Sequence, residues 1–445
     1  MRRAGVYTRR TSIAVAVAAV AGVGLRLSRP TSDSSGPVRR TYHLDPAGSD
    51  DADGLSPGTA WRTLDRLRRV VLAPGDSVLL RGGTRFTGML QLDHTDAGSA
   101  AEPVTIGSYG SGKAIIAAQA TSAVYIHNTA GVEIRDLEVI GDSGAYIGNG
   151  GIVCYNDLTD GRILEHIVIS GVEASGFKNG IEIGAASTGF RNVTVNNSLA
   201  HDNMEAGVAV YGPDLQPSAP HYAHAQITIS SVQAYLNAGD PGNTERNTGS
   251  GIVLGSVSSG LIEQSSAYEN GWLCTAPQGP AGIWTYDSTA IVIERNVAHH
   301  NYTGGDADGD GFDLDQNTSD CVLQDNVSYD NDGAGLMLYA EKAGTYNRNN
   351  IIRNNVATGS PTNSAWYGGI TLAGNVTGAQ ITGNTVTVSA SGPTQPPAVR
   401  LAGTLGGVVM SNNRLTSNGA GPIIATQDGA DPNAILRPDN QMSGP

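Results

Sequence analysis

The amino-acid sequence predicts an all-β protein whose chain winds into a parallel β-helix, a solenoid of about 10 coils. Three observations predict this fold. A short phrase, consisting of a glycine followed by apolar, variable and apolar residues, recurs along the chain. Asparagines recur at a nearly constant spacing, and no helical apolar period of comparable length occurs after residue 73. A repeat that cannot bury its own apolar face must stack on its neighbours, and the stacked strands then form parallel sheets.

The composition agrees with this fold and excludes several classes of protein. The 445 residues include 59 glycines, and only 15% of the residues are charged, which argues against a coiled coil or a charge-rich helical bundle. The net charge is −14, and residues 41–445 carry 19 basic and 40 acidic side chains, a balance of −21. We therefore expect no nucleic-acid partner. A soluble, monomeric, extracellular protein fits this composition.

Residues 1–40 are predicted to be a signal peptide and a linker. Four arginines in the first eleven residues precede an apolar run at residues 13–25, which is the layout of an export signal. Residues 8–13 also resemble the twin-arginine export motif. The apolar run is shorter than the roughly 20 residues that span a bilayer. We therefore expect a secreted protein with no membrane association in its mature form.

Residues 41–430 are predicted to form the β-helix domain, and the Pro- and Asn-rich residues 431–445 an irregular tail. The first coil of a solenoid exposes its core and its strand edges unless another element covers them. Residues 61–71 place apolar side chains at helical spacing, with charged side chains on the opposite side. We therefore expect an N-terminal capping helix in this segment.

The repeats also predict the register of the coils. The glycine phrase begins at Gly151, Gly180, Gly207, Gly251, Gly282, Gly311, Gly335 and Gly369. Two asparagine series advance in steps of 29 to 34 residues: Asn203, Asn237, Asn270, Asn301 and Asn331, and then Asn296, Asn326, Asn355, Asn384 and Asn413. We expect each asparagine, at a left-handed turn, to hydrogen-bond the equivalent asparagine one coil away.

The three cysteines, Cys154, Cys274 and Cys321, have no metal-type spacing. Cys274 and Cys321 can pair if neighbouring coils bring them together. Buried free thiols are the alternative, and both interpretations stay open.

Three segments resemble the opening motifs of secreted right-handed parallel β-helix proteins of the pectate-lyase-like superfamily: residues 42–61, 74–83 and 102–112. With the repeats, the resemblance covers nearly all of residues 41–420. It implies a right-handed solenoid and a secreted protein that is active on a polysaccharide. Members of this superfamily include lyases, glycoside hydrolases and uronate epimerases, so the resemblance does not select one reaction.

When the glycine phrases of successive coils stack, the third residue of each phrase points outward, and these residues form one column. The residues two positions later form a second outward column. Asp313 and Asp315 then lie on an exposed face between aromatic residues of the neighbouring coils. Aromatic faces beside carboxylates are typical of sugar-binding grooves. The predicted substrate-binding residues are Trp284, Tyr286, Asp287, His300, Tyr339, Lys342 and Arg348.

The approach to this strand is rich in aspartates and predicts a calcium site. Alternating carboxylates followed by a glycine match the first half of an EF-hand loop, in which such carboxylates bind a hard cation. The twelfth loop position is Asn317 and no flanking helices are predicted, which excludes a complete EF-hand. A solvated acidic turn is the alternative. The expected calcium ligands are Asp306, Asp308, Asp310 and Asp313.

Residues 309–313 (Gly-Asp-Gly-Phe-Asp) also resemble the calcium-binding phrase of family 9 of the polysaccharide lyases. The resemblance implies calcium ligation by Asp310 and Asp313. In that family a lysine on a later coil abstracts the proton, whereas the best counterpart here is Met337. Lys342 or Arg348 in the following loop is the candidate replacement.

Two reactions therefore stay open, with Asp310, Asp313 and Asp315 as the catalytic candidates. Glycoside hydrolysis needs one carboxyl group as acid and another as base, and Asp313 with Asp315 fits an inverting pair, with Asp310 or Asp287 as a third candidate. Calcium-assisted β-elimination of a uronate needs a cation and a base. The alternative from another class is a non-catalytic carbohydrate-binding or cell-surface protein with a structural calcium site.

Overall fold

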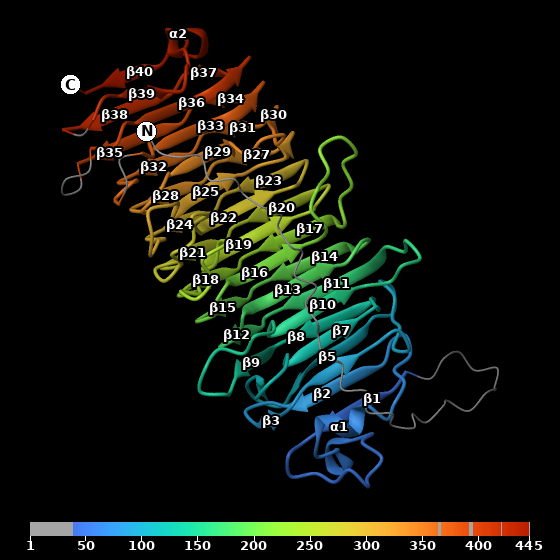
Figure 1. Cartoon of the computed structure of the whole chain (residues 1–445). Helices are drawn as coiled ribbons and strands as arrows, with labels where there is room; N and C mark the ends of the chain where they lie inside the picture. Colours follow the sequence, from blue (N-terminus) through green and yellow to red (C-terminus); the bar gives the residue numbers. More distant parts are fainter. Residues whose placement is uncertain (1–38, 364–365, 391–394, 420, 445) are drawn as a thin grey trace.

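The computed structural model describes residues 39–363, 366–390, 395–419 and 421–444, so the signal peptide predicted for residues 1–40 lies almost entirely outside the described residues. The chain forms a right-handed parallel β-helix with three long sheets of 13, 14 and 13 strands (Figure 1). Successive strands of the chain visit the sheets in turn, and each strand pairs with its equivalents one coil earlier and one coil later. The solenoid has more coils than the 10 that the repeats predicted.

The strands of the three sheets have the following bounds. The first sheet contains β1 (Thr41–Leu44), β2 (Ser77–Arg81), β5 (Val104–Tyr109), β8 (Val132–Arg135), β11 (Leu164–Ser170), β14 (Phe190–Asn196), β17 (Ala225–Ser230), β20 (Gly260–Glu263), β23 (Ile291–Glu294), β27 (Val322–Gln324), β31 (Ile351–Arg353), β34 (Gln380–Thr382) and β37 (Val409–Ser411). The second contains β4 (Leu90–Leu92), β7 (Val124–His127), β10 (Ile152–Asn156), β13 (Asn179–Ala185), β16 (Ala206–Tyr211), β19 (Ser250–Gly255), β22 (Ala281–Tyr286), β25 (Asp310–Leu314), β26 (Thr318–Ser319), β29 (Leu336–Ala340), β30 (Asn347–Arg348), β33 (Ile370–Thr377), β36 (Val399–Gly406) and β39 (Ile424–Gln427). The third contains β3 (Arg85–Thr87), β6 (Ala114–Ala118), β9 (Leu137–Gly141), β12 (Glu173–Ser175), β15 (Leu199–His201), β18 (Gln233–Tyr235), β21 (Ser266–Tyr268), β24 (Val297–His299), β28 (Val327–Tyr329), β32 (Val356–Thr358), β35 (Thr385–Ser389), β38 (Arg414–Asn418) and β40 (Gln441–Ser443).

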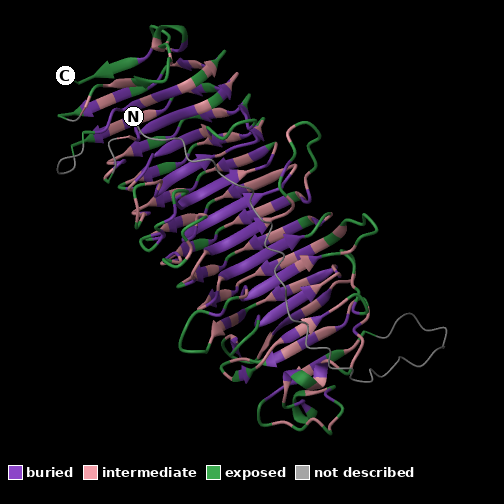
Figure 2. Ribbon diagram, in the orientation of Figure 1, coloured by how far each residue is buried: buried purple, intermediate pink, exposed green. Residues whose placement is uncertain are grey.

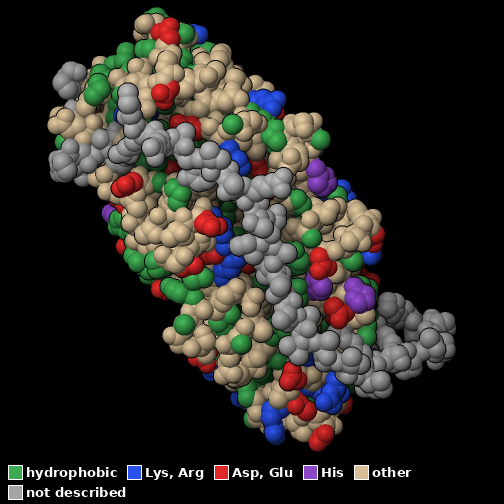
Figure 3. Space-filling view, in the orientation of Figure 1, with side chains coloured by type: hydrophobic (Ala, Val, Ile, Leu, Met, Phe, Trp, Pro, Cys, Tyr) green, Lys and Arg blue, Asp and Glu red, His purple; other side chains and the backbone are tan. Residues whose placement is uncertain are grey.

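The core is a continuous apolar column inside the solenoid, formed by the alternating inward residues of all three sheets. Ile283, Phe312 and Leu336 occupy equivalent positions on successive coils of the second sheet, and all three are fully buried. Figure 2 shows the same burial along the whole stack of strands. On the face shown in Figure 3, acidic and basic side chains are scattered among a largely uncharged surface.

Two asparagine ladders line the turns, as the spacing predicted. Each side-chain amide donates to the side-chain oxygen of the next asparagine, over 2.8–3.1 Å, in the series from Asn203 to Asn331 and in the series from Asn296 to Asn440. One detail differs from the prediction. The left-handed backbone belongs to the residue before the asparagine, for example Arg295 (φ 55°) and Asp325 (φ 56°).

The ends of the solenoid differ from the sequence prediction. The capping helix α1 covers only Leu64–Leu67, preceded by a short 3-10 turn at Pro57–Thr59, in place of the helix expected over residues 61–71. Trp61 instead forms a parallel bridge with Leu44, which gives it extended backbone in the first coil. At the other end, the tail that was expected to be irregular contains helix α2 (Pro432–Ile435) and strand β40, which pairs with β38.

Two further predictions concern the whole chain. The three cysteines are free and buried, so Cys274 and Cys321 do not pair. Among the residues that the structure describes, no helix is long and apolar enough to cross a membrane.

Candidate active site

The predicted register is present on the second sheet. Trp284, Asp313 and Met337 pair in sequence across β22, β25 and β29, so each lies at the same position on successive coils. The second column continues alongside, and Tyr339 of β29 pairs with Ala373 of β33. The glycine phrase therefore brings together residues that the sequence places about 30 positions apart.

Asp310 and Asp313 lie side by side in a slot with apolar walls. Asp310 pairs with Ala281 of the preceding coil, where Ala281 and Trp284 pack in one apolar cluster. On the following coil, Ala334 and Met337 pack in a second cluster. The two aspartates occupy the equivalent positions between these clusters. We call the carboxyl groups of Asp308, Asp310, Asp313 and Asp315 the acid slot.

The sequence predicted an exposed groove at this position. The acid slot is instead buried. Asp310 is 1% exposed and Asp313 is 8% exposed. The apolar walls account for part of this burial. Tyr367, which precedes the glycine phrase of the next coil, packs against Ala334 and Met337 and accounts for a further part. Water is largely excluded from the two carboxyl groups.

Two oxygens of these carboxyl groups have no hydrogen-bond partner among the described residues. Asp310 accepts a hydrogen bond from the Ala334 amide through Oδ1, whereas its Oδ2 is buried without a partner. Oδ1 of Asp313 is also buried and unpartnered. Unsatisfied buried oxygens are rare in proteins and point to a ligand or a proton that occupies them.

Asp308 differs because both of its carboxyl oxygens are bonded. Oδ1 accepts from the Tyr367 hydroxyl at 2.7 Å, and Oδ2 accepts from the Gly279 amide at 2.8 Å. Burial raises the pKa of Asp308, and these two hydrogen bonds oppose the rise because they stabilise the carboxylate. Asp308 therefore serves to hold Tyr367 over the slot.

The pKa values of the two central aspartates are raised well above their ordinary value. For Asp313 burial has the largest effect, followed by the negative charges of Asp315, Asp310 and Asp308. For Asp310 burial again comes first, then the charge of Asp308, while the Ala334 amide opposes the rise. A raised pKa widens the pH range over which a carboxyl group keeps its proton, which is a property that a general acid requires.

The predicted aromatic residues line this region. Trp284 is 8% exposed, stacks on Tyr286 with ring centroids 5.2 Å apart, and donates from its indole nitrogen to Ser250 Oγ over 3.1 Å. Tyr286 lies flat over Gly255, where an added Cβ would come within 2.3 Å of the ring. Glycine is therefore required beneath this tyrosine, which explains the alternation of Tyr and Gly in the second column.

Several predicted site residues lie elsewhere. Asp287 is buried and holds two distant segments, because its carboxylate accepts from the Leu215 amide at 3.0 Å and from Asn317 Nδ2 at 2.7 Å. His300 lies beside the third sheet, 4.0 Å from Asp330. Lys342 and Arg348 line a separate cavity beyond Tyr339. Asp306 is exposed on the loop before the slot.

The residues expected to bind calcium do not fit a resident ion well. Asp308 is occupied by Tyr367 and Gly279, and one oxygen of Asp310 is occupied by a backbone amide. Across the described ranges, no group of three or more His, Cys, Asp or Glu side chains is arranged to hold a metal. Calcium binding stays a prediction.

Tyr367 is the site residue that the sequence analysis missed. It lies 59 positions after Asp308 and belongs to a segment between strands, outside the repeated phrase. Its position two residues before Gly369 was the only available signal, since residues just before the glycine phrase border the outward column.

The three parallel sheets define the fold as a right-handed parallel β-helix. A family model described as right handed beta helix region matches residues 226–386. A lacto-N-biosidase from Bifidobacterium longum subsp. longum is 26% identical over 491 aligned positions, which cover 85% of this chain and 30% of the relative. The chain therefore spans less than one third of the length of the curated relative that it matches.

Two solved structures show the same fold. The GH136 lacto-N-biosidase from Eubacterium ramulus matches with a TM-score of 0.63 at 16% identity, covering 91% of this chain and 68% of that one. The A-module of a mannuronan C-5 epimerase from Azotobacter vinelandii matches with a TM-score of 0.56 at 16% identity, covering 83% and 91%. These similar proteins are enzymes named for oligosaccharide or polysaccharide substrates.

Proposed function

We propose that the protein is a glycoside hydrolase that cleaves an extracellular oligosaccharide or polysaccharide, with Asp313 as general acid and Asp315 as the second carboxylate. The observation that carries this proposal is the buried, unpartnered oxygen of Asp313 beside other carboxyl groups. The export signal read from residues 1–40 supports a substrate outside the cell.

The geometry assigns a distinct task to each group. Asp313 retains its proton because burial and neighbouring charges raise its pKa, and it donates this proton to the glycosidic oxygen as the bond breaks. Asp315 lies two residues further along the chain, directly after the end of β25, and accepts a hydrogen bond from the Gln316 amide at 2.6 Å. It is only partly buried, so it is placed to activate water or to attack the anomeric carbon.

Hydrolysis suits the acid slot better than β-elimination. Elimination requires a base to remove a proton and a cation to neutralise the uronate. Met337 occupies the position of the lyase base. The similarity to a lacto-N-biosidase also favours a hydrolase.

The test is a cleavage assay on a panel of neutral and uronate-containing glycans, including an aryl lacto-N-bioside, with calcium or with chelator. We expect new reducing ends without the ultraviolet absorbance of an unsaturated product, and no loss with chelator. Unsaturated products that need calcium would establish elimination. Binding without cleavage across the panel would establish the non-catalytic alternative.

Substitution of the proposed acid gives the sharpest residue-level test. Asp313→Asn keeps the shape of the side chain and removes its transferable proton. We expect kcat on a substrate with a poor leaving group to fall by about 10²–10⁴-fold, which is the range for loss of general acid–base catalysis. Asp51→Asn, an equivalent change on an exposed residue at the far end of the solenoid, is the control. Retained activity in Asp313→Asn would remove this residue from the mechanism.

A further inference from the structure

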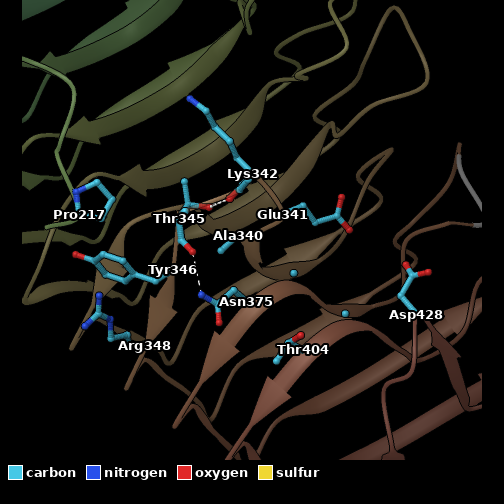
Figure 4. Close-up of a pocket in the computed structure, with 14 residues that line it drawn as sticks. Pro217, Ala340, Glu341, Lys342, Thr345, Tyr346, Arg348, Asn375, Thr404 and Asp428 are labelled. Atoms are coloured by element: carbon cyan, nitrogen blue, oxygen red, sulfur yellow. Dashed lines mark hydrogen bonds between the residues drawn. The ribbon is translucent and has the colours of Figure 1, made fainter. Parts of the chain in front are cut away.

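A cavity of about 610 Å³ opens beyond the acid slot, at the end of β29 and over the middle of β33 and β36 (Figure 4). Ala340, Gly374 and Gly403 occupy equivalent positions on these three strands and form its floor. The loop at residues 341–346 forms one wall, and Pro217 from the distant loop at residues 212–222 contributes to another. Lys342 and Arg348, two of the predicted substrate-binding residues, belong to its lining.

The floor depends on two glycines with left-handed backbone. Gly374 has φ +88° and Gly403 has φ +86°. A Cβ added at Gly374 would lie 2.3 Å from the Ala340 carbonyl, and one added at Gly403 would lie 2.9 Å from the Gly374 carbonyl. Any side chain at these positions would strain the backbone and clash with the preceding coil, so the floor stays flat and open.

The walls are fixed by hydrogen bonds. The Lys342 carbonyl accepts from the Thr345 amide at 3.0 Å and from the Thr345 hydroxyl at 2.6 Å, and Asn375 Nδ2 donates to the Thr345 carbonyl at 3.0 Å. On the far side, the loop that carries Pro217 is held through Leu215, whose amide donates to Asp287 at 3.0 Å. The buried Asp287 therefore has a positioning role for one wall of the cavity.

The cavity lining has no net charge, because Glu341 and Asp428 are balanced by Lys342 and Arg348, and this balance suits an uncharged ligand with many hydroxyl groups. Glu341 and Asp428 lie on the same side in Figure 4, and the charge of Asp428 adds to burial in raising the pKa of Glu341. The Thr404 hydroxyl also faces this region. In the same view the Lys342 side chain points away from Asn375 and Thr404. The acidic side chains accept hydrogen bonds from sugar hydroxyls, and the basic side chains donate to them.

Tyr339 connects the cavity with the acid slot. Its hydroxyl donates to Glu341 Oε2 over 3.4 Å. After burial, the charges that raise its pKa are those of Glu341 on one side and of Asp315, Asp308 and Asp313 on the other. One aromatic ring therefore borders both sites. Ala340, Gly374 and Gly403 of the cavity floor lie one, two and three coils from Asp313, or roughly 5–14 Å along the solenoid axis at the spacing of paired strands.

We infer that this cavity is a distal subsite for an uncharged sugar unit, and that the substrate is consequently a chain which passes from the acid slot over Tyr339 to Glu341 and Asp428. The inference rests on the proposed function and adds the substrate class. It assigns the enzyme to longer, neutral glycans, since a disaccharide at the acid slot would not reach the far end of the floor at Gly403, three coils away.

The test compares substrates of increasing length, prepared from the neutral glycan that the panel shows to be cleaved. The double variant Glu341→Gln/Asp428→Asn keeps both side-chain shapes and removes both charges. We expect the ratio of kcat/KM for the longest to the shortest oligosaccharide to fall at least fivefold, through KM. Asp51→Asn, which makes the same chemical change far from the cavity, should leave this ratio unchanged. An unchanged ratio in the double variant would overturn the inference while the proposed function stands.

A binding experiment shows whether the subsite inference or the proposed hydrolase function has failed. Retardation of the Asp313→Asn protein is measured by affinity electrophoresis in gels that contain galactomannan, xyloglucan, laminarin, alginate or polygalacturonate. We expect retardation by a neutral glycan and its loss when Glu341→Gln/Asp428→Asn is added. If a neutral glycan retards the protein, the double substitution abolishes this retardation, and the unsubstituted protein cleaves nothing, then the proposed hydrolase function is wrong while the subsite is supported. Retardation by the anionic gels alone, or by none, would overturn the subsite.

Discussion

Asp313 carries a carboxyl group where an apolar side chain would stabilise the coil better. The equivalent residues on the neighbouring coils are Trp284 and Met337, and both are buried in apolar clusters. A carboxyl group in the same column loses hydration without gaining a hydrogen bond for Oδ1. Residues that destabilise the fold in this way are typical of functional sites.

This cost predicts a pH-dependent stability. A carboxyl group with a raised pKa binds its proton more tightly in the folded than in the unfolded state. Its contribution to stability is therefore complete at low pH and is lost as pH rises from the unfolded pKa, near about 3.9, through the folded value. Asp313→Asn removes the penalty, and we expect it to raise the free energy of unfolding at pH 7 by about 1.4 kcal/mol for each unit by which the pKa is raised.

The measurement is chemical unfolding of Asp313→Asn and the unsubstituted protein at pH 7 and at acid pH. The difference in unfolding free energy should be positive at pH 7 and vanish below the ordinary pKa of aspartate. Asp51→Asn, at an exposed position, should show no such pH dependence. If Asp313→Asn lowered the stability relative to the unsubstituted protein, and did so more at pH 7 than at acid pH, the assigned direction of the pKa shift would be wrong.

We expect substitution of Tyr367 to change the pH profile of activity. Its hydroxyl stabilises the charged form of Asp308, and that charge raises the pKa of Asp313. In Tyr367→Phe, Asp308 keeps its proton to higher pH and the pKa of Asp313 falls. We expect the basic limb of the kcat/KM profile to move to lower pH, because that limb reports deprotonation of the acid. A loss of kcat/KM that is equal at every pH would assign Tyr367 a packing role only.

At the scale of the element, the asparagine ladder holds the turns in register. Asn326 shows the pattern, since its amide donates to Ile293 O at 2.8 Å and to Asn355 Oδ1 at 3.0 Å, while its oxygen accepts from Asn296. Each ladder residue thus satisfies backbone groups that water cannot reach. The spacing in the sequence was sufficient to predict this arrangement, because constant steps of about one coil have no other simple origin.

Asn326→Ala tests the ladder. The change leaves the Ile293 carbonyl and the Asn296 donors without their partner inside the solenoid, so we expect the free energy of unfolding to fall by about 3 kcal/mol. Asn418→Ala, at an exposed position in β38, should change it by less than about 0.5 kcal/mol. Denaturant unfolding curves give both values. Equal, small effects would show that the turns are held by strand pairing alone.

The sequence predicted correctly those elements that follow the repeat, and it predicted poorly those that do not. The register of β22, β25 and β29 could be predicted because the same phrase begins each strand. The length of α1 could not, since the pairing of Trp61 with Leu44 outweighs the helical pattern of residues 61–71. The burial of the acid slot was also missed, because Tyr367 arrives from a segment that does not repeat.

At the scale of the whole molecule, the solenoid makes a site from residues that are distant in sequence. Outward columns on the second sheet place Trp284, Asp313 and Met337 about one strand spacing apart. Loops from other coils complete the surroundings, as Leu215 does by bonding to Asp287. The surroundings of the acid slot are therefore determined by outward columns and inserted loops, while the inner core is apolar.

The central claim is that the acid slot keeps a carboxyl group protonated at Asp313, ready to act as a general acid. NMR titration of ¹³C-labelled aspartate carboxyl groups, in the unsubstituted protein and in Asp313→Asn, tests it most directly. We predict a resonance that titrates well above the ordinary range near about pH 3.9 and that disappears in the variant. Asp310, whose pKa is also raised by burial, should still give a resonance of this kind in the variant. Ordinary titration of every aspartate in the unsubstituted protein, or an Asp313→Asn spectrum that has lost no high-pKa resonance, would contradict the account.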